Sequence, residues 1–257
     1  MTLELDHEAA SLMPHVLDFM YSQGGDDMVK ISNKNAVAMH YVARVLGIVV
    51  LSKKVLEYIG SNISLDNVAA YIIQAYSFKD YKTIAIACRL CAQKITLIDA
   101  DSELLKELEP DFFVQVVSSA DIDESAKCHV TILITQYFSL HDLNENMIQN
   151  LLKSIDVKQV DHLSALKLLN ILTGLEKYDG IEIFEEMKIY CANIMTEEWA
   201  KLTNDHREEM FSIFPRLNPT LLTNMFDTVD RKYKMEHSES LLMQSKLVKR
   251  YRGQVAE

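Results

Sequence analysis

Residues Ser64 to Leu97 read SLDNVAAYIIQAYSFKDYKTIAIACRLCAQKITL, and this stretch decides the fold. Its first half places apolar side chains on one helical face, at Leu65, Val68, Ala69, Ile72, Ile73 and Tyr76. Ser64 precedes that face as the expected N-cap. The second half repeats the pattern at Ile84, Ala85, Cys88, Cys91, Ala92 and Ile95 and adds a second apolar stripe at Ile86, Leu90 and Leu97. A helix that is apolar on two sides lies between neighbours, so this stretch predicts two antiparallel helices in a core layer.

Composition extends the helical prediction to the whole chain. Only seven Gly and four Pro occur among 257 residues, and Gly24, Gly25, Gly174 and Gly180 fall between apolar segments, where loops belong. The net charge of −11 argues against a general binder of nucleic acid or anionic membranes, because phosphate affinity depends mostly on Lys and Arg. The longest apolar run, Val45 to Leu51, is too short to span a bilayer. We therefore expect an all-α protein with no membrane segment.

The first 20 residues contain acidic and no basic side chains, the wrong charge for a signal or transit peptide. We expect a cytosolic or nuclear protein with reduced, buried cysteines. Cys88 and Cys91 form one C-x-x-C pair, and a zinc site would need two further ligands at fixed spacing. Neither of the common glycine-rich nucleotide motifs is present. The sequence therefore predicts no metal, no cofactor and no catalytic residue.

Further elements flank the central pair. Residues 2–6 alternate like a short strand, and residues 8–22 predict one helix with Leu12, Val16, Phe19 and Met20 inward. A helix then breaks near Gly47, and Leu51 to Ile59 predicts another. Helices are also predicted from Pro110, over Glu124 to His141, Leu163 to Leu175 and Ile181 to Met195, and around Trp199. The pairs start near residues 64, 123, 162 and 197, and this irregular spacing predicts stacked hairpins without a sequence repeat.

The order of these motifs resembles a known pair of domains. TLELDHEAASLMPHVLDFMYSQ (2–23), ISNKNAVAMHYVARVLGI (31–48) and LSKKVLEYI (51–59) look like the second half of a BTB/POZ domain. The stretch from residue 64 to 95 resembles the opening helix pair of a BACK domain, which commonly follows BTB. The resemblance implies a partial BTB segment over 1–60, with at most one or two short strands, and a BACK-like domain over 61–160. Stacked antiparallel hairpins continue over 161–224, before a basic helix or tail over 225–257.

The same resemblance implies a function. BTB plus BACK proteins are substrate adaptors of cullin-type E3 ubiquitin ligases, so we expect a non-catalytic interaction protein that binds a cullin scaffold and a protein substrate. Carried over by position, the candidate contacts are Phe19, Tyr21, Asn35, Met39, Tyr71 and Phe78. Each of these also fits a core position. The dimer-forming strand and helix of a BTB domain have no counterpart in this sequence, so a BTB dimer is not expected.

Two alternatives remain open. One is a helical scaffold unrelated to ubiquitin. The other is an all-helical enzyme with a pocket within residues 120–200, where His129 adjoins Cys128 and His141 adjoins Asp142. The basic residues of the C-terminal segment, Lys246, Lys249, Arg250 and Arg252, are interpreted as a solvated terminus rather than an RNA contact.

Overall fold

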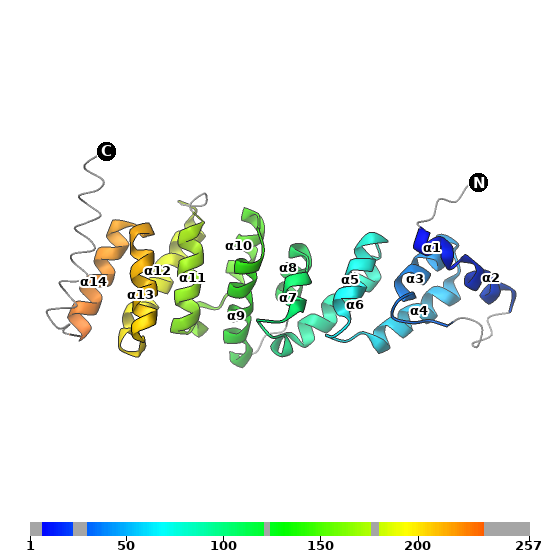
Figure 1. Ribbon diagram of the computed structural model, residues 1–257, viewed down its shortest axis with the longest axis horizontal. Coiled ribbons are helices and arrows are strands. Elements are labelled where there is room, and N and C mark those ends of the chain that lie inside the picture. The colour runs from blue at the N-terminus through cyan, green and yellow to red at the C-terminus, as the bar shows by residue number, and fades with distance from the viewer. Residues whose placement is uncertain (1–6, 23–29, 121–123, 176–179, 234–257) are drawn as a thin grey trace. The chain divides into compact units, whose positions relative to one another are not determined.

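The computed structural model describes residues 7–22, 30–120, 124–175 and 180–233, and within them it contains helices and no strand (Figure 1). The all-α prediction is thereby confirmed for this part of the chain. The predicted strand at 2–6, the loop at 23–27 and the basic residues between 246 and 252 lie outside the described residues. None of the described helices is both long and apolar enough to cross a membrane.

The chain divides into two compact units, Met1–Asp121 and Ile122–Glu257. The predicted boundary between residues 60 and 61 falls inside the first unit, where α4 contacts α6 across it. The prediction of one continuous array of hairpins over the whole chain stays a prediction.

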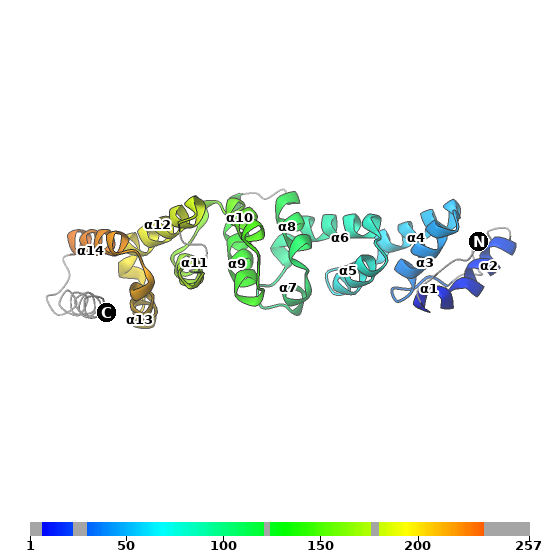
Figure 2. The same cartoon turned by 90° about the horizontal axis from the view of Figure 1, so that it is seen from above.

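The first unit contains pairs of consecutive helices. Its elements are α1 (His7–Ser11), α2 (Met13–Tyr21), α3 (Ala36–Val45), α4 (Val49–Asn62), α5 (Val68–Ser77), α6 (Tyr81–Gln93), η1 (Ile95–Leu97), α7 (Glu103–Glu107) and α8 (Pro110–Ser119). Helix α3 packs against α4 and α5, while α6 packs against α4, α5 and α8. Within this unit, Figure 2 shows α4, α6 and α8 along one side and α3, α5 and α7 along the other. The helix pair predicted between residues 64 and 97 is thus α5 and α6, in contact.

The helix pair α3 and α4 and the helix pair α5 and α6 repeat one another at a fixed spacing along the sequence. Helices α3 and α5 begin at residues 36 and 68, and α4 and α6 begin at 49 and 81, so each follows its counterpart by 32 residues. The turns before α3 and α5 also match, since Ser32 N donates to Asn35 Oδ1 and Ser64 N donates to Asn67 Oδ1, both at 2.8 Å. The spacing of these helices therefore repeats in this part of the chain, although few residues outside the turn are identical. Ser64 is likewise not the N-cap, because Asn67 is the last residue before α5.

Helices α3 and α5 also end in the same way. Ile48 N donates to Ala43 O and Asp80 N donates to Ala75 O, each at 2.8 Å, which closes the six-residue turn of a Schellman motif. This turn needs a left-handed residue, found at Gly47 with φ 72° and at Lys79 with φ 50°. The predicted break near Gly47 is thus confirmed, and a second one follows 32 residues later.

The predicted helix over residues 8–22 is instead two helices, α1 and α2. The break falls after Ser11 because Pro14 lies in the first turn of α2, and proline is tolerated there but not inside a helix. Val16 and Phe19 are buried as expected. Met20 was expected inward, but its side chain is 52% exposed.

The second unit is a group of helices around α11 and α12. Its elements are α9 (Glu124–Leu140), α10 (Glu145–Lys153), η2 (Val157–Gln159), α11 (His162–Gly174), α12 (Glu182–Glu197), η4 (Trp199–Lys201), α13 (Asn204–Ile213), η5 (Phe214–Arg216) and α14 (Pro219–Tyr233). Helix α11 contacts α9, α12 and α13, and α12 also contacts α10 and α14. The predicted pairing of 163–175 with 181–195 is confirmed, and Trp199 lies in a short 3-10 turn.

Side-chain caps start several helices of the second unit. Asn144 Oδ1 accepts from Met147 N at 3.0 Å before α10, and Thr203 Oγ1 accepts from His206 N at 3.3 Å before α13. Asp161 Oδ1 accepts from the backbone N–H of Leu163, at 2.8 Å, before α11. Each cap binds an N–H group that the first turn of a helix leaves without an internal partner.

Candidate interaction surface

Four of the six residues carried over from the BTB and BACK resemblance are buried. Their exposed fractions are 4% for Phe19, 0% for Met39, 1% for Tyr71 and 7% for Phe78. Neighbouring helices cover them because they occupy the inner positions of the apolar helical faces. They are core residues in this structure and do not offer a surface to a partner.

Tyr71 and Phe78 illustrate these core positions. The Tyr71 hydroxyl donates to Asn33 Oδ1 at 2.9 Å, and burial, followed by the nearby Tyr58, raises its pKa to about 12. Phe78 stacks on Tyr41 with ring centroids 5.1 Å apart. Tyr71 thus connects α5 to the turn before α3, and Phe78 connects the end of α5 to α3, so their substitution would disturb packing before it affected binding.

The two remaining candidates differ. Asn35 is half-buried, and its amide is engaged in the turn before α3, where Nδ2 donates to Lys30 O at 3.0 Å. Tyr21, at the end of α2, is 85% exposed. Of the six, Tyr21 is the side chain that solvent and partners reach.

Exposed large apolar side chains concentrate in the first unit. Among the described residues they are Leu17, Met20, Tyr21, Val45, Val49, Val50, Ile73, Tyr76, Tyr81 and Leu97 in the first unit and Leu163 and Ile189 in the second. Single exposed apolar residues are common on soluble proteins, whereas groups of them mark interaction sites. Ten of these twelve side chains therefore lie in the first unit.

One such group lies where the two repeated helix pairs turn, and we call it the hairpin-end surface. It consists of Val45 at the end of α3, Val49 and Val50 at the start of α4, and Tyr81 at the start of α6, exposed by 40%, 76%, 68% and 72%. Arg44 at the end of α3 binds the loop before α6, so the end of α3, the start of α4 and the start of α6 lie at the same end of the unit.

Arg44 connects the two turns directly. Its guanidinium donates to the carbonyl oxygens of Phe78, at 3.1 Å, and Lys79, at 3.2 Å, and lies 5.7 Å from the centre of the Tyr41 ring. The end of α3 is thereby joined to the loop before α6. This contact brings Val45, which follows Arg44, close to the segment that leads into Tyr81.

The charges around the hairpin-end surface are basic. Arg44, Lys79 and Lys82 are exposed there. Asp80 lies between these lysines in the sequence, but its side chain is 0% exposed and faces His40 instead of solvent. A chain with a net charge of −11 therefore presents a positively charged, apolar surface at this end of its first unit.

Below this surface lies a buried polar cluster. His40 Nδ1 lies 2.5 Å from Asp80 Oδ2, and the Thr83 hydroxyl donates to the same oxygen at 2.7 Å. Burial by itself would raise the pKa of Asp80, but the hydrogen bonds from His40 and Thr83 outweigh it and hold the pKa below its ordinary value. Asp80 is therefore ionised at neutral pH.

The enzyme alternative places a pocket within residues 120–200, most of which belong to the second unit. His141 stacks on Tyr137 with ring centroids 4.0 Å apart, and the Cys128 thiol donates to Asp161 Oδ2 at 3.3 Å. Partial burial, followed by the Asp161 carboxylate, raises the pKa of this thiol above its ordinary value, the opposite of an activated nucleophile. In the described ranges no three His, Cys, Asp or Glu side chains lie close enough to hold a metal ion.

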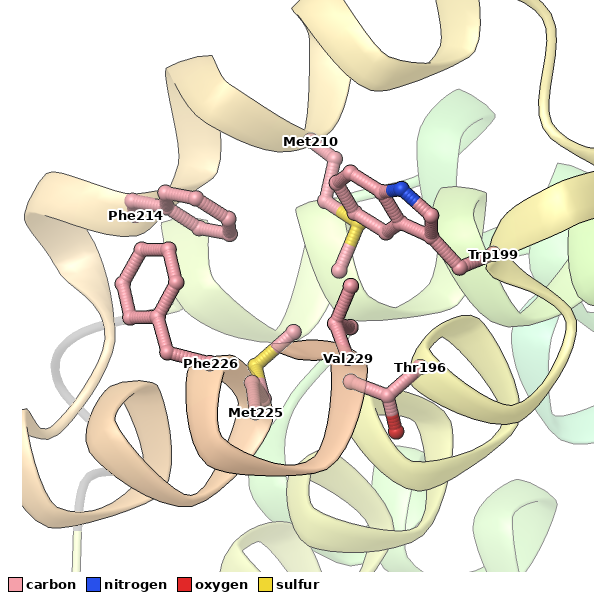
Figure 3. A pocket seen from close by; sticks show the side chains of 7 residues that line it. All are labelled: Thr196, Trp199, Met210, Phe214, Met225, Phe226 and Val229. Carbon is pink, nitrogen blue, oxygen red and sulfur yellow. The ribbon is translucent and has the colours of Figure 1, made fainter. Parts of the chain in front are cut away.

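A crevice in the second unit is apolar and tight. Figure 3 shows it between α12, η4, α13, η5 and α14, lined by Thr196, Trp199, Met210, Phe214, Met225, Phe226 and Val229. It has no room for a water molecule, and Thr196 Oγ1 donates to the backbone oxygen of Asn193 at 2.8 Å instead of facing a ligand. This crevice is part of the core.

No family model, curated protein or solved structure matches this chain. The resemblance to BTB and BACK domains therefore rests on the quoted motifs. The hairpin-end surface was missed in the sequence because Val45 to Leu51 was interpreted only by its length. The sequence signal for this surface was Val45 before the helix-ending Gly47 and Val49 and Val50 after it. Residues next to a hairpin turn have few neighbours to cover them.

Proposed function

We propose that this protein is a non-catalytic interaction protein and that the hairpin-end surface binds another protein. The observation that carries the proposal is the group of Val45, Val49, Val50 and Tyr81, exposed at adjacent helix starts and ends beside Arg44. Tyrosine and arginine are enriched at protein interfaces, and aliphatic side chains around them exclude water. The surface is held by two matching turns, so little ordering is needed on binding.

The finer proposal is a substrate-adaptor-like component of a cullin-type E3 ubiquitin ligase in the cytoplasm or nucleus. It is supported by the BTB and BACK resemblance, which assigns cullin docking to the helices of the first unit. Tyr21 offers a further exposed side chain on α2. A protein substrate would then bind elsewhere on the chain.

Binding of the full chain to a purified cullin scaffold tests the finer proposal. Val49→Asp and Tyr81→Asp place a charge on exposed positions, so both variants should fold and lose affinity by about 10-fold or more, as interface anchors do. Ile189→Asp is the matched control, because Ile189 is an exposed apolar residue of the second unit. Absence of wild-type binding, or equal binding by all variants, would refute the adaptor proposal.

The broader proposal has its own test. A photo-crosslinking amino acid at position 49 should capture partner proteins in cells, whereas the same group at position 189 should not. Capture of partners without a cullin would favour the scaffold alternative. Equal capture at the two positions would refute an interaction role for the hairpin-end surface.

A further inference from the structure

The His40–Asp80 pair joins the two repeated helix pairs at one point. His40 lies on α3, and Asp80 is the residue immediately before α6. Their side chains are 1% and 0% exposed, and Nδ1 and Oδ2 are 2.5 Å apart. In the structure as described, His40 Nε2 and Asp80 Oδ1 have no hydrogen-bond partner.

This pair is not explained by stability. Removing two ionisable groups from water has a large cost, and apolar residues of similar volume often stabilise a protein equally well or better. In the 32-residue repeat, the residue equivalent to His40 is the buried Ile72 and the residue equivalent to Asp80 is the half-buried Ile48, so each position of the pair has an aliphatic counterpart elsewhere in this unit. The hydrogen-bonded pair supplies a contact of fixed direction, which apolar residues at these two positions would not.

The geometry of the loop indicates that purpose. Asp80 follows Lys79 and precedes Tyr81, and the Thr83 hydroxyl holds the same carboxylate oxygen from inside α6. Arg44 binds the loop from the outside, through the carbonyl oxygens of Phe78 and Lys79. The loop is thus attached to α3 on both sides, which sets the position of Tyr81 relative to Val45.

We infer that His40 and Asp80 are positioning residues for the hairpin-end surface, an inference that rests on the function proposed above. They hold the start of α6 against α3 by a hydrogen bond of fixed direction. Thr83 supports them by orienting the carboxylate. Apolar packing could fill the same volume but would lack a contact of fixed direction on this side of the loop.

Hydrogen exchange tests the inference without a partner protein. The His40→Ile/Asp80→Ile double variant replaces both members of the pair by apolar residues, so its thermal midpoint should remain close to that of the wild type. Exchange of the amides of residues 78–82 should accelerate about 10-fold or more, while residues 46–50 in the equivalent loop exchange as before. Unchanged exchange at 78–82, or equal acceleration in both loops, would overturn the inference.

Two single variants complete the design. His40→Asn keeps a donor where Nδ1 lies and should exchange as the wild type does at 78–82, which a loss of bulk would not allow. Thr83→Val removes one donor at constant volume and should accelerate exchange in that loop alone, even if the double variant fails to fold. No acceleration in Thr83→Val would overturn the inference.

The exchange experiment can be decided independently of the cullin-binding experiment. If the cullin scaffold binds the wild type, the double variant should bind it more weakly, and His40→Asn should bind it as the wild type does. If the scaffold does not bind the wild type, the adaptor proposal fails, and the exchange results still decide whether the pair positions the loop.

Discussion

Gly47 and Lys79 occupy the same place in two consecutive helix pairs, and both have a left-handed backbone, with φ of 72° and 50°. Each follows a helix whose last carbonyl groups are bound by the same two turn hydrogen bonds. Glycine adopts this conformation without strain, whereas a residue with a Cβ atom does not. Of the two equivalent turns, one therefore has glycine at the left-handed position, which is favourable, and the other has Lys79, which is strained there.

We predict opposite effects of substitution at these two positions. Lys79→Gly should stabilise the first unit by about 0.5 kcal/mol, because the relief of strain exceeds the entropy that glycine gains in the unfolded chain. Gly47→Ala should destabilise it by about 1 kcal/mol through strain alone, since no atom lies within 4 Å of the added Cβ. Urea unfolding followed by circular dichroism measures both, and changes of the same sign would contradict the argument.

Phe214→Ala should destabilise the second unit by about 3 to 5 kcal/mol, because it leaves a cavity in a packed core. Phe214 is 5% exposed and contacts Phe211 and Phe226 edge to face, with centroids 5.3 and 5.5 Å away. Trp199, the single tryptophan of the chain, lines the same crevice, so its fluorescence measures the unfolding of the second unit. The exposed Ile189→Ala is the control, expected within about 0.5 kcal/mol of the wild type.

Acid should weaken the second unit through Asp161. Partial burial would raise the pKa of this carboxyl, but hydrogen bonds from Ser164, Cys128 and Leu163 outweigh it and keep the pKa below the ordinary value of 3.8. A lowered pKa stabilises the folded state above the ordinary value, and this stabilisation is lost as the pH falls through 3.8 to the folded value.

The corresponding variant is Asp161→Asn, which keeps an acceptor for the helix cap but cannot titrate. The free energy of unfolding, followed by Trp199 fluorescence between pH 5 and pH 3, should fall less steeply in this variant. Identical slopes in the variant and the wild type would show that Asp161 does not contribute.

The native thiols should react slowly with a disulfide reagent at neutral pH. Burial raises the pKa of Cys191 to about 12, and burial together with the neighbouring Cys88 raises that of Cys91 to about 12. Cys128 is half-buried and should react first. Thiol titration should show one early group that Cys128→Ser removes, and all four cysteines should react after unfolding. Rapid native reaction of two or more thiols would contradict these pKa values.

Some features were readable from sequence because they depend on neighbours along the chain. The apolar period of residues 68–76 and 84–95 predicted α5 and α6, Gly47 predicted the end of α3, and Pro110 predicted the start of α8. These signals work because side chains three or four residues apart share a helical face, and because Gly and Pro restrict or free the local backbone. The match of Ile-Ser-x-x-Asn at 31 and 63 was also visible, but little else in the two segments is identical.

The sequence by itself thus determined where helices form and which face of each is apolar. Tertiary structure decided which apolar residues are covered, so that Met39 is buried while Met20 and Val49 are exposed. It also decided that His40 meets Asp80, which lies 40 residues away. The physical reason is that the spacing of apolar residues shows which face of a helix is apolar but not which neighbour covers it. A contact between residues far apart in the sequence depends on how the helices pack.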